Sequence, residues 1–325
     1  MTTTSEGAAG GAGRPTGGLS LAVAVARRVH LDGASKVQVA AELGITRFKV
    51  ARLLDMAHEA GLVRTVVAAP AETDEALEQA LQERYGLRHV VVTTDAGDDP
   101  AMARLRVGRL AAEWAEHVVA DGDVVGLAWG RTMSVVHEHW RRRVAATFVQ
   151  LAGSLVRADV DRNGPELVGS FARRSGGRAA LFYAPLLVAD ATTATALRAD
   201  PAVADALRQA DELTKALVAV GAWSEGRSTV FDALPLDERN ALRRAGVCAE
   251  VTGVLLDAEG RVVDDLADRT LAVTADQLRR ADHVVALAVG VDRAVAVRAA
   301  LRSGLVDGLV THAALAAAVL AGDRA

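Results

Sequence analysis

The sequence contains a single cysteine, Cys248, among its 325 residues. One cysteine cannot form a disulfide within the chain, and no N-terminal stretch has the order of basic, apolar and small residues that marks a secretion signal. No segment reaches the roughly 18 to 20 consecutive apolar residues that are needed to cross a bilayer. These absences exclude a disulfide scaffold and a membrane-spanning protein, and they predict a soluble protein of the cytoplasm.

Aromatic residues are also scarce, because Phe, Trp and Tyr together make up only 3% of the chain. Hydrophobic residues make up 51% and charged residues 24%, which is typical of a globular protein and excludes a chain that is disordered throughout. The core must therefore be packed mainly with Ala, Val and Leu. The length allows about two domains of roughly 150 residues each.

Positive charge is in slight deficit, since the net charge is −4, and for the whole chain this argues against a nucleic-acid-binding protein. The charge is unevenly distributed, however. Residues 19–65 carry seven Lys or Arg against four Asp or Glu, a net charge of +3. Residues 1–18 are neutral, so residues 66–325 carry a net charge of −7. A basic segment joined to an acidic one is expected when one domain contacts a polyanion and the other does not.

The apolar pattern divides the chain into four parts. Residues 1–18 are mainly Gly, Ala, Thr and Ser and are predicted to be a disordered tail. In residues 19–65 apolar side chains recur at helical spacing, which predicts three short helices. Residues 66–85 are predicted to form a linker and a connecting helix over 75–85. A larger second domain is expected over residues 86–325.

Residues 35–52 have the features of a helix-turn-helix. Ser35 and Thr46 are suitable N-caps for the second and third helices, and Gly44 stands where the second helix must end with a positive φ. The short turn lets the third helix present its first turn to base edges in a DNA major groove. The residues predicted to contact double-stranded operator DNA are Ser35, Lys36, Gln38, Thr46, Arg47, Phe48, Lys49 and Arg52. The alternative is a three-helix bundle that only mediates dimerisation and whose basic residues form a solvated face.

From His89 onward, short Val-rich or Leu-rich runs alternate with helical patterns. Such alternation predicts parallel strands covered on both faces by crossover helices, because valine-rich sheet faces must be buried. We therefore predict an all-α helix-turn-helix domain followed by a doubly wound, mainly parallel α/β domain. A hairpin turn is expected at residues 257–260. The expected strands are 89–94, 123–129, 148–152, 180–187, 217–222, 250–256, 283–289 and 308–311.

The end of the expected strand 123–129 is a candidate phosphate site. Ligands of open α/β sheets bind beyond the carboxyl ends of strands, where free N–H groups at a helix start face an anion. Gly130 lets the backbone approach a ligand closely, Arg131 adds charge and Thr132 adds a hydroxyl. The alternative is an ordinary turn between a strand and a helix.

No metal or cofactor is expected. The segment from Asp159 mimics the start of a calcium loop, but its twelfth position is Ser170, which cannot supply the bidentate carboxylate. His137 and His139 are two residues apart on an expected helix, so they point to different sides and cannot share a metal.

The helical segment of residues 19–65, called the head below, and the ends of the expected strands together resemble one known family. The run Ser35–Arg47 (SKVQVAAELGITR), followed by Val50, Arg52–Leu54 and Glu59–Val63, is similar to the head of the SorC-type sugar-binding transcriptional regulators. The resemblance covers nearly the whole chain after residue 19. It implies an N-terminal helix-turn-helix, an effector domain related in fold to sugar-phosphate isomerases of the glucosamine-phosphate deaminase kind, and self-association as dimers or tetramers.

The resemblance also implies an effector site in the C-terminal domain. The segment Trp129–Thr132 resembles the family's phosphate loop, and the turn after the next strand lies beside the sugar in the family. Glu250 takes the place of an acidic residue that accepts hydrogen bonds from sugar hydroxyls. The implied effector-binding residues are Trp129, Gly130, Arg131, Thr132, Gly153, Ser154, Asn163, Glu166, Glu250 and Arg293.

The C-terminal signature departs from the family pattern, which has two glycines, a lysine and an Asp-Glu pair. The departures are at Val289, Arg293, His312 and Ala313. The positive charge survives at Arg293 and could still hold a phosphate, but an arginine does not replace a lysine in detail. These changes indicate an atypical effector.

Together these observations predict a DNA-binding transcriptional regulator whose operator affinity or assembly is controlled by a sugar phosphate or related polyol bound in the C-terminal domain. One alternative is an isomerase or deaminase-like enzyme that carries a helical head. Enediol chemistry needs a general base over the sugar C1–C2 bond, and Glu250 has no identifiable partner acid. No catalytic residue is assigned, and the protein is predicted not to be an enzyme.

Overall fold

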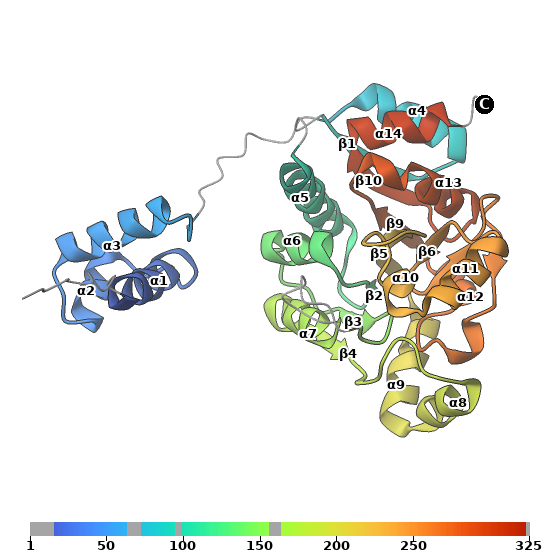
Figure 1. The fold of residues 1–325 in the computed structure, drawn as a ribbon, viewed down its shortest axis with the longest axis horizontal. Coiled ribbons are helices and arrows are strands. Elements are labelled where there is room, and N and C mark those ends of the chain that lie inside the picture. The colour runs from blue at the N-terminus through green and yellow to red at the C-terminus, as the bar shows by residue number, and fades with distance from the viewer. Residues whose placement is uncertain (1–15, 64–72, 95–98, 156–163, 323–325) are drawn as a thin grey trace, which may run out of the picture. The chain divides into compact units, whose positions relative to one another are not determined.

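A computed structural model describes residues 16–63, 73–94, 99–155 and 164–322. The chain divides into two compact units, residues 1–69 and residues 70–325. The described part of the first unit is helical, and the second unit is built around a β-sheet (Figure 1). The predicted end of the head, residue 65, lies outside the described residues.

Unit 1 is a bundle of three helices, α1 (Thr16–His30), α2 (Lys36–Glu42) and α3 (Arg47–Glu59). Its small core includes Val25 and Val50, which are completely buried. Helix α1 begins at Thr16, so helical structure starts inside the stretch that the composition assigns to the tail.

The turn between α2 and α3 has the local contacts that the sequence predicts. Ser35 and Gln38 form a capping box, in which the Ser35 hydroxyl accepts from the Gln38 N–H and the Gln38 side-chain oxygen accepts from the Ser35 N–H. The Thr46 hydroxyl accepts from the Lys49 N–H at 3.2 Å, and Gly44 has a φ of +61°. The caps therefore set where both helices begin, and Gly44 allows α2 to end.

The centre of unit 2 is a parallel sheet with the strand order β1-β10-β9-β5-β2-β3-β4. Its strands are β1 (His89–Thr93), β2 (Val124–Leu127), β3 (Thr147–Gln150), β4 (Arg178–Ala180), β5 (Lys215–Ala222), β9 (His283–Leu287) and β10 (Gly308–His312). Strand β5 lies in the middle, because Leu217 pairs with Leu127 of β2 and with Val285 of β9.

Helices cover both faces of this sheet, which confirms the doubly wound α/β prediction. On one face lie α5 (Pro100–Val118), α6 (Arg131–His139) and α7 (Gly164–Ser175), and on the other lie α4 (Glu75–Tyr85), α12 (Ala275–Arg280), α13 (Ala294–Arg302) and α14 (Ala313–Ala321) (Figure 1). Leu217 faces the first core and Val218 the second. The strands read as continuous apolar runs because both of their faces are buried.

The other described elements of unit 2 are α8 (Ala191–Ala199), α9 (Pro201–Gln209), α10 (Thr229–Ala233), α11 (Leu236–Arg244) and three 3₁₀ helices, η1 (Ala210–Glu212), η2 (Ala267–Arg269) and η3 (Val291–Arg293). None of the helices in the described ranges has the length and apolar character that crossing a membrane would require.

The expected single strand 250–256 is instead two antiparallel strands, β6 (Ala249–Val251) and β7 (Val254–Leu256). The chain reverses at Thr252 and Gly253, whose φ angles are +52° and +90°. A third strand, β8 (Val262–Val263), pairs with β7 across the predicted hairpin turn 257–260. Both strands are buried and largely apolar, so the hydrophobic pattern of the sequence does not show where the chain reverses.

The expected strand 180–187 is also different. Only Arg178–Ala180 forms β4, and the chain then continues through isolated bridges such as the one between Ser154 and Pro185. Proline has no N–H to donate to a strand ladder, which limits regular pairing at this position.

Candidate functional site

The first turn of α3 presents polar and basic side chains to solvent. Thr46, Arg47, Lys49 and Arg52 are exposed, whereas Val50 on the same helix is buried in the core. None of these three cations has an ion-pair partner among the described residues. They are therefore available to an anionic partner.

Other polar residues of the head have local partners. Arg28 donates to both oxygens of Glu42 and forms a second ion pair with Asp32 at 2.8 Å. Ser35 and Gln38 are exposed, but the hydroxyl of one and the side-chain oxygen of the other are used in the capping box. The exposed basic residues of this unit are therefore those of α3, together with Lys36 on α2 and Arg27 at the end of α1.

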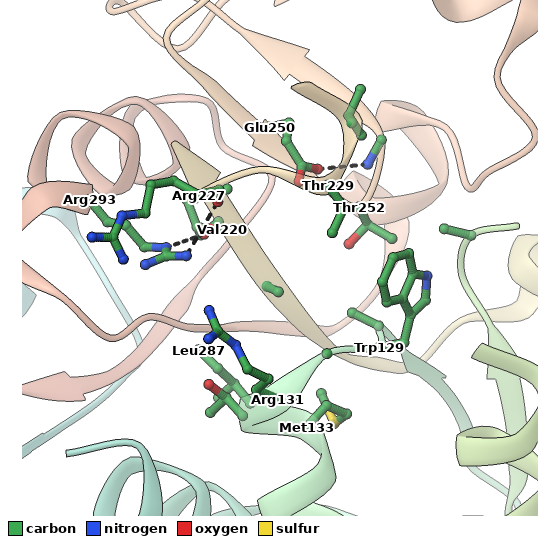
Figure 2. A pocket seen from close by; sticks show the side chains of 18 of the residues that line it. Trp129, Arg131, Met133, Val220, Arg227, Thr229, Glu250, Thr252, Leu287 and Arg293 are labelled. Atoms are coloured by element: carbon green, nitrogen blue, oxygen red, sulfur yellow. Dashed lines mark hydrogen bonds between the residues drawn. The ribbon is translucent and has the colours of Figure 1, made fainter. Parts of the chain in front are cut away.

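One pocket of unit 2 lies at the carboxyl ends of β2, β5 and β9, the position predicted from the parallel topology (Figure 2). Its empty space, including the open mouth, is about 1030 Å³. Six of the predicted effector-binding residues line it: Trp129, Gly130, Arg131, Thr132, Glu250 and Arg293.

The loop between β2 and α6 forms one wall of the pocket. Gly130 is the N-cap of α6 and has a φ of +131°, a conformation that L side chains rarely adopt. A Cβ placed on Gly164, the first residue of α7, would lie 3.2 Å from the Trp129 ring, so α7 begins against this side chain. The loop therefore directs the start of α6, with its free N–H groups, toward the pocket.

Four arginines line the same pocket: Arg104, Arg131, Arg227 and Arg293. Figure 2 shows Arg131 reaching in from the α6 side and Arg227 and Arg293 lying opposite. Burial lowers the pKa of Arg104, and the charge of Arg131 lowers that pKa further. A guanidinium nevertheless stays protonated, so these charges repel one another, although Arg227 is paired with Asp292.

Arg293 is held by backbone carbonyls. Its guanidinium donates to the carbonyls of Val289 at 3.0 Å, Val220 at 3.3 Å and Arg227 at 3.3 Å. Burial is the main cause that lowers its pKa; Asp292 opposes this effect, and the charges of the other three pocket arginines add to it. Three of its five N–H groups are thus used to fix its position, and two remain for a ligand.

Glu250 lies on β6 and is 7% exposed. One carboxylate oxygen accepts from the Gly253 N–H at 3.1 Å, and the other accepts from the Ser228 hydroxyl at 3.4 Å. Burial raises the pKa of this carboxyl, while the two hydrogen bonds and the charge of Arg293 act in the opposite direction.

Thr252 combines backbone strain with an unsatisfied hydroxyl. It has the only positive φ of a non-glycine residue in the described part of the chain. Its hydroxyl is buried and has no hydrogen-bond partner there, although the residue lines the pocket. Strain and orphaned polar groups of this kind concentrate at ligand sites.

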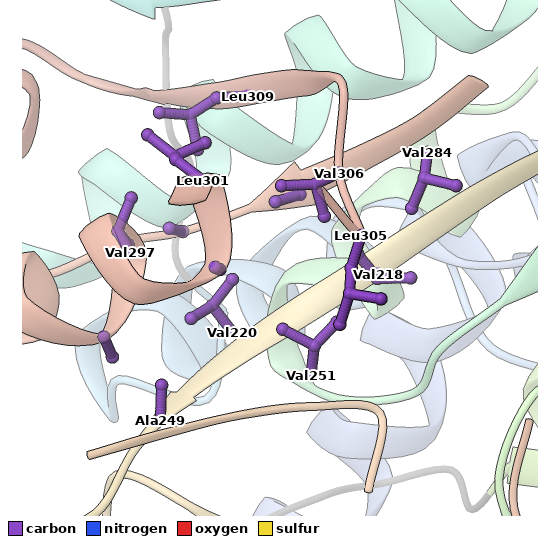
Figure 3. Packing of buried hydrophobic residues seen from close by; sticks show 14 of the residues in the cluster. Val218, Val220, Ala249, Val251, Val284, Val297, Leu301, Leu305, Val306 and Leu309 are labelled. Atoms are coloured by element: carbon purple, nitrogen blue, oxygen red, sulfur yellow. The ribbon is translucent and has the colours of Figure 1, made fainter. Parts of the chain in front are cut away.

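The strands that carry these groups are anchored from behind. Val220 of β5 and Val251 of β6 belong to an apolar cluster that also contains Val297 and Leu301 of α13 (Figure 3). The polar pocket wall is therefore fixed by a packed core.

Some predicted site residues are not brought into the pocket. Gly153 and Ser154 do not line it; a Cβ on Gly153 would lie 2.6 Å from the backbone of Pro185, so this glycine permits close packing of two segments. Glu166 is exposed on α7 and is not a lining residue. Asn163 lies outside the described residues.

The set of predicted site residues lacks Arg104, Arg227 and Thr252, which also line the pocket. Arg227 follows the carboxyl end of the expected strand 217–222, and that position was a usable signal. Arg104 lies on a helix that gives no such signal, because only the packing of α5 beside α6 directs it to the pocket.

The sequence of unit 2 matches a known domain over most of its length. Residues 69–321 match the family model described as "Putative sugar-binding domain". The chain is also 30% identical over 309 residues to the transcriptional regulator LsrR of Enterobacter sp. (strain 638), with 93% of each chain covered. The chain belongs to the SorC-type family of sugar-binding transcriptional regulators.

Further similarities of this SorC-type regulator agree with that assignment. It is 27% identical over 309 residues to the erythritol catabolism regulatory protein EryD of Brucella abortus (strain 2308), which covers 93% of this chain and 96% of that protein. The crystal structure of the full-length sorbitol operon regulator SorC from Klebsiella pneumoniae has a TM-score of 0.69 and 22% identity, and covers 94% of this chain and 100% of that chain. At this identity the crystal structure supports the fold.

Two of the four departures in the C-terminal signature of this SorC-type regulator, Val289 and Arg293, line the pocket. The Gly290 N–H donates to the His312 ring nitrogen at 3.1 Å. The histidine thus connects the end of β10 to the turn that precedes Arg293. In the described residues, no group of three His, Cys, Asp or Glu side chains is arranged to hold a metal ion.

Proposed function

We propose that this SorC-type regulator binds a double-stranded DNA operator through the first turn of α3, and that a phosphorylated sugar or polyol in the unit 2 pocket controls that binding. The observation that most directly supports this proposal is the set of charged and polar groups that line the pocket. Four arginines line it together with a buried carboxyl and an unpartnered hydroxyl.

The arginines support an anionic ligand. Burial chiefly lowers the pKa values of Arg104 and Arg293, and the neighbouring arginines lower them further; a bound anion would oppose both effects. A phosphate presents several acceptor oxygens, and planar guanidinium groups bind such oxygens in pairs. The N-terminus of α6 adds free N–H groups beside Arg131.

Other lining groups support a ligand rich in hydroxyls. Glu250 and Thr252 can exchange hydrogen bonds with adjacent hydroxyls, and the Trp129 ring offers an apolar surface to the C–H groups of a sugar or polyol. Two similar proteins are named for erythritol catabolism and for a sorbitol operon. A phosphorylated derivative of a polyol or sugar matches both sets of groups.

The composition of the pocket supports binding without turnover. Apart from the arginines, Glu250 is the only ionisable residue that lines it among the described residues. Isomerisation or deamination of a sugar phosphate needs both an acid and a base near the reacting carbons. We therefore propose a sensor that releases its ligand unchanged; conversion of a bound sugar phosphate in a chromatographic assay would contradict this proposal.

We further propose that the regulator self-associates as a dimer or tetramer, so that paired heads meet paired half-sites on DNA. A ligand can change the spacing of the heads only if it binds one arrangement more tightly than another. Light scattering with and without ligand measures the assembly.

Thermal shift tests the ligand class. Purified protein is screened against sugar phosphates, polyol phosphates and the matching unphosphorylated compounds. A ligand at about 100 times its Kd stabilises the native state by about 2.7 kcal/mol. We expect phosphorylated compounds to raise the Tm and to change the gel shift of operator DNA, and their unphosphorylated counterparts to act weakly. Stabilisation by no compound that carries a phosphate would overturn the proposed ligand class.

A further inference from the structure

Phe48 is unlike the other phenylalanines of this chain. The chain has five, and four of them are at most 5% exposed: Phe148, Phe171, Phe182 and Phe231. The side chain of Phe48 is 86% exposed. The buried residues of α3 are Val50, Leu53, Leu54 and Ala57, so the packing of unit 1 does not require this ring.

The position of the ring is specific. Phe48 is the second residue of α3, between Arg47 and Lys49, and Arg52 is one turn further along the same side. All three cations are exposed. In a helix-turn-helix, the N-terminal residues of the second helix face base edges in the major groove.

The charges around the ring select its partner. A second copy of the same surface would bring these cations against their own copies, and like charges at an interface are repulsive. A membrane surface is also a poor partner, because α3 uses its apolar face for the core and has no second apolar face to insert. A polyanion that carries an apolar group within reach of the ring satisfies both features.

We propose that Phe48 is a specificity residue that packs its ring against the C5-methyl group of a thymine in the operator. This inference rests on the proposed DNA-binding function. The thymine methyl is the apolar group of the major groove, and phenylalanine is among the side chains that contact it. Over any other base edge the ring would cover polar groups without hydrogen-bonding to them. Arg47 and Arg52 are then placed to bind neighbouring bases or phosphates.

The test uses the full-length protein and an operator selected from random duplexes. Each thymine of the selected site is replaced in turn by deoxyuridine, which keeps base pairing and removes only the methyl group. Burial of one methyl-sized group is worth about 0.8 kcal/mol, so we expect roughly a fourfold loss of affinity at one or two positions. Phe48→Ala should bind the thymine and uracil duplexes equally.

Matched variants distinguish contact with a thymine methyl group from contacts with phosphates that do not depend on sequence. Lys49→Ala should weaken binding to both duplexes by the same factor and reduce the salt dependence, since phosphate contacts carry no sequence information. Phe48→Leu keeps an apolar group and should retain part of the thymine preference. If circular dichroism shows that Phe48→Ala does not fold, Phe48→Leu is used in its place. Full uracil sensitivity in Phe48→Ala, or none in the wild type, overturns the thymine assignment while DNA binding stands. If the wild type selects no DNA at any salt concentration, the proposed function itself fails, and this inference with it.

Discussion

The carboxylate of Glu250 occupies the space that a side chain on Gly221 would need. The two residues face each other across the antiparallel pair of β5 and β6. A Cβ on Gly221 would lie 2.4 Å from a carboxylate oxygen of Glu250. The glycine is therefore the reason that a carboxyl group can be buried against the middle strand of the sheet and still face the pocket.

Gly221→Ala should displace Glu250 and destabilise unit 2. Overpacking of this kind typically costs about 1–3 kcal/mol, and the displaced carboxyl should no longer reach the effector. We expect a lower Tm and a smaller ligand-induced thermal shift. Gly169→Ala on α7 is the control: its new Cβ would meet only the flexible end of Arg173 at 3.3 Å and Leu181 at 3.5 Å, so it should keep both the Tm and the ligand response. Equal behaviour of the two variants would contradict the role of Gly221.

Glu250 should make the free protein less stable as the pH rises. Its folded-state pKa is raised, chiefly by burial, so the native state holds this proton above the pH at which the unfolded chain has lost it. Stability therefore falls with rising pH from the unfolded pKa, near 4.5, up to the raised folded pKa. Glu250→Gln should remove this slope and raise the Tm at neutral pH. The measurement is urea unfolding at several pH values, and an unchanged slope would contradict the assignment.

The effector response should depend on Glu250 separately from stability. Glu250→Ala removes the acceptor that faces the ligand hydroxyls, so we expect it to leave DNA binding intact and to abolish the change in the gel shift on adding effector. The same variant should show a reduced ligand-induced rise in Tm. An unchanged response would exclude this carboxyl from the site.

Gly130→Asp should block the anion end of the pocket. It introduces a side chain at a φ of +131° and a negative charge beside Arg131. We expect loss of the thermal shift with phosphorylated ligands and unchanged binding of operator DNA. Gly122→Asp adds the same charge at a φ of +89° but on an exposed turn that does not line the pocket, so it controls for strain. A preserved ligand response in Gly130→Asp would place the anion elsewhere.

The double variant Arg47→Ala with Lys49→Ala should abolish operator binding and leave assembly intact. Each lost phosphate contact reduces the slope of log affinity against log salt by about one. Gel shifts at two salt concentrations, together with light scattering, measure both effects. A double variant of Arg173 and Arg244, which are exposed residues of unit 2, removes the same charge and should bind DNA normally. Loss of assembly in the Arg47 and Lys49 variant would show that the head serves mainly to dimerise.

Local chemistry made the head predictable. The caps Ser35 and Thr46 and the positive φ of Gly44 depend on contacts within three residues, and the structure has all of them. The connecting helix over residues 75–85 was predicted for the same reason, because its periodicity lies within one segment.

The sequence by itself determined the alternation of strands and helices and the presence of a glycine turn after β2, since apolar periodicity and backbone preferences act over short distances. Only the tertiary structure decided which side chains meet in the pocket. Arg104, Arg227 and Glu250 come from segments far apart in the chain, and packing of α5 and of the β6–β7 reversal brings them together. The tertiary structure also keeps Gly153 out of the pocket, because the backbone of Pro185 and Leu186 fills the space beside this glycine. Such placements follow from the burial of whole helices against the sheet, which no local pattern encodes.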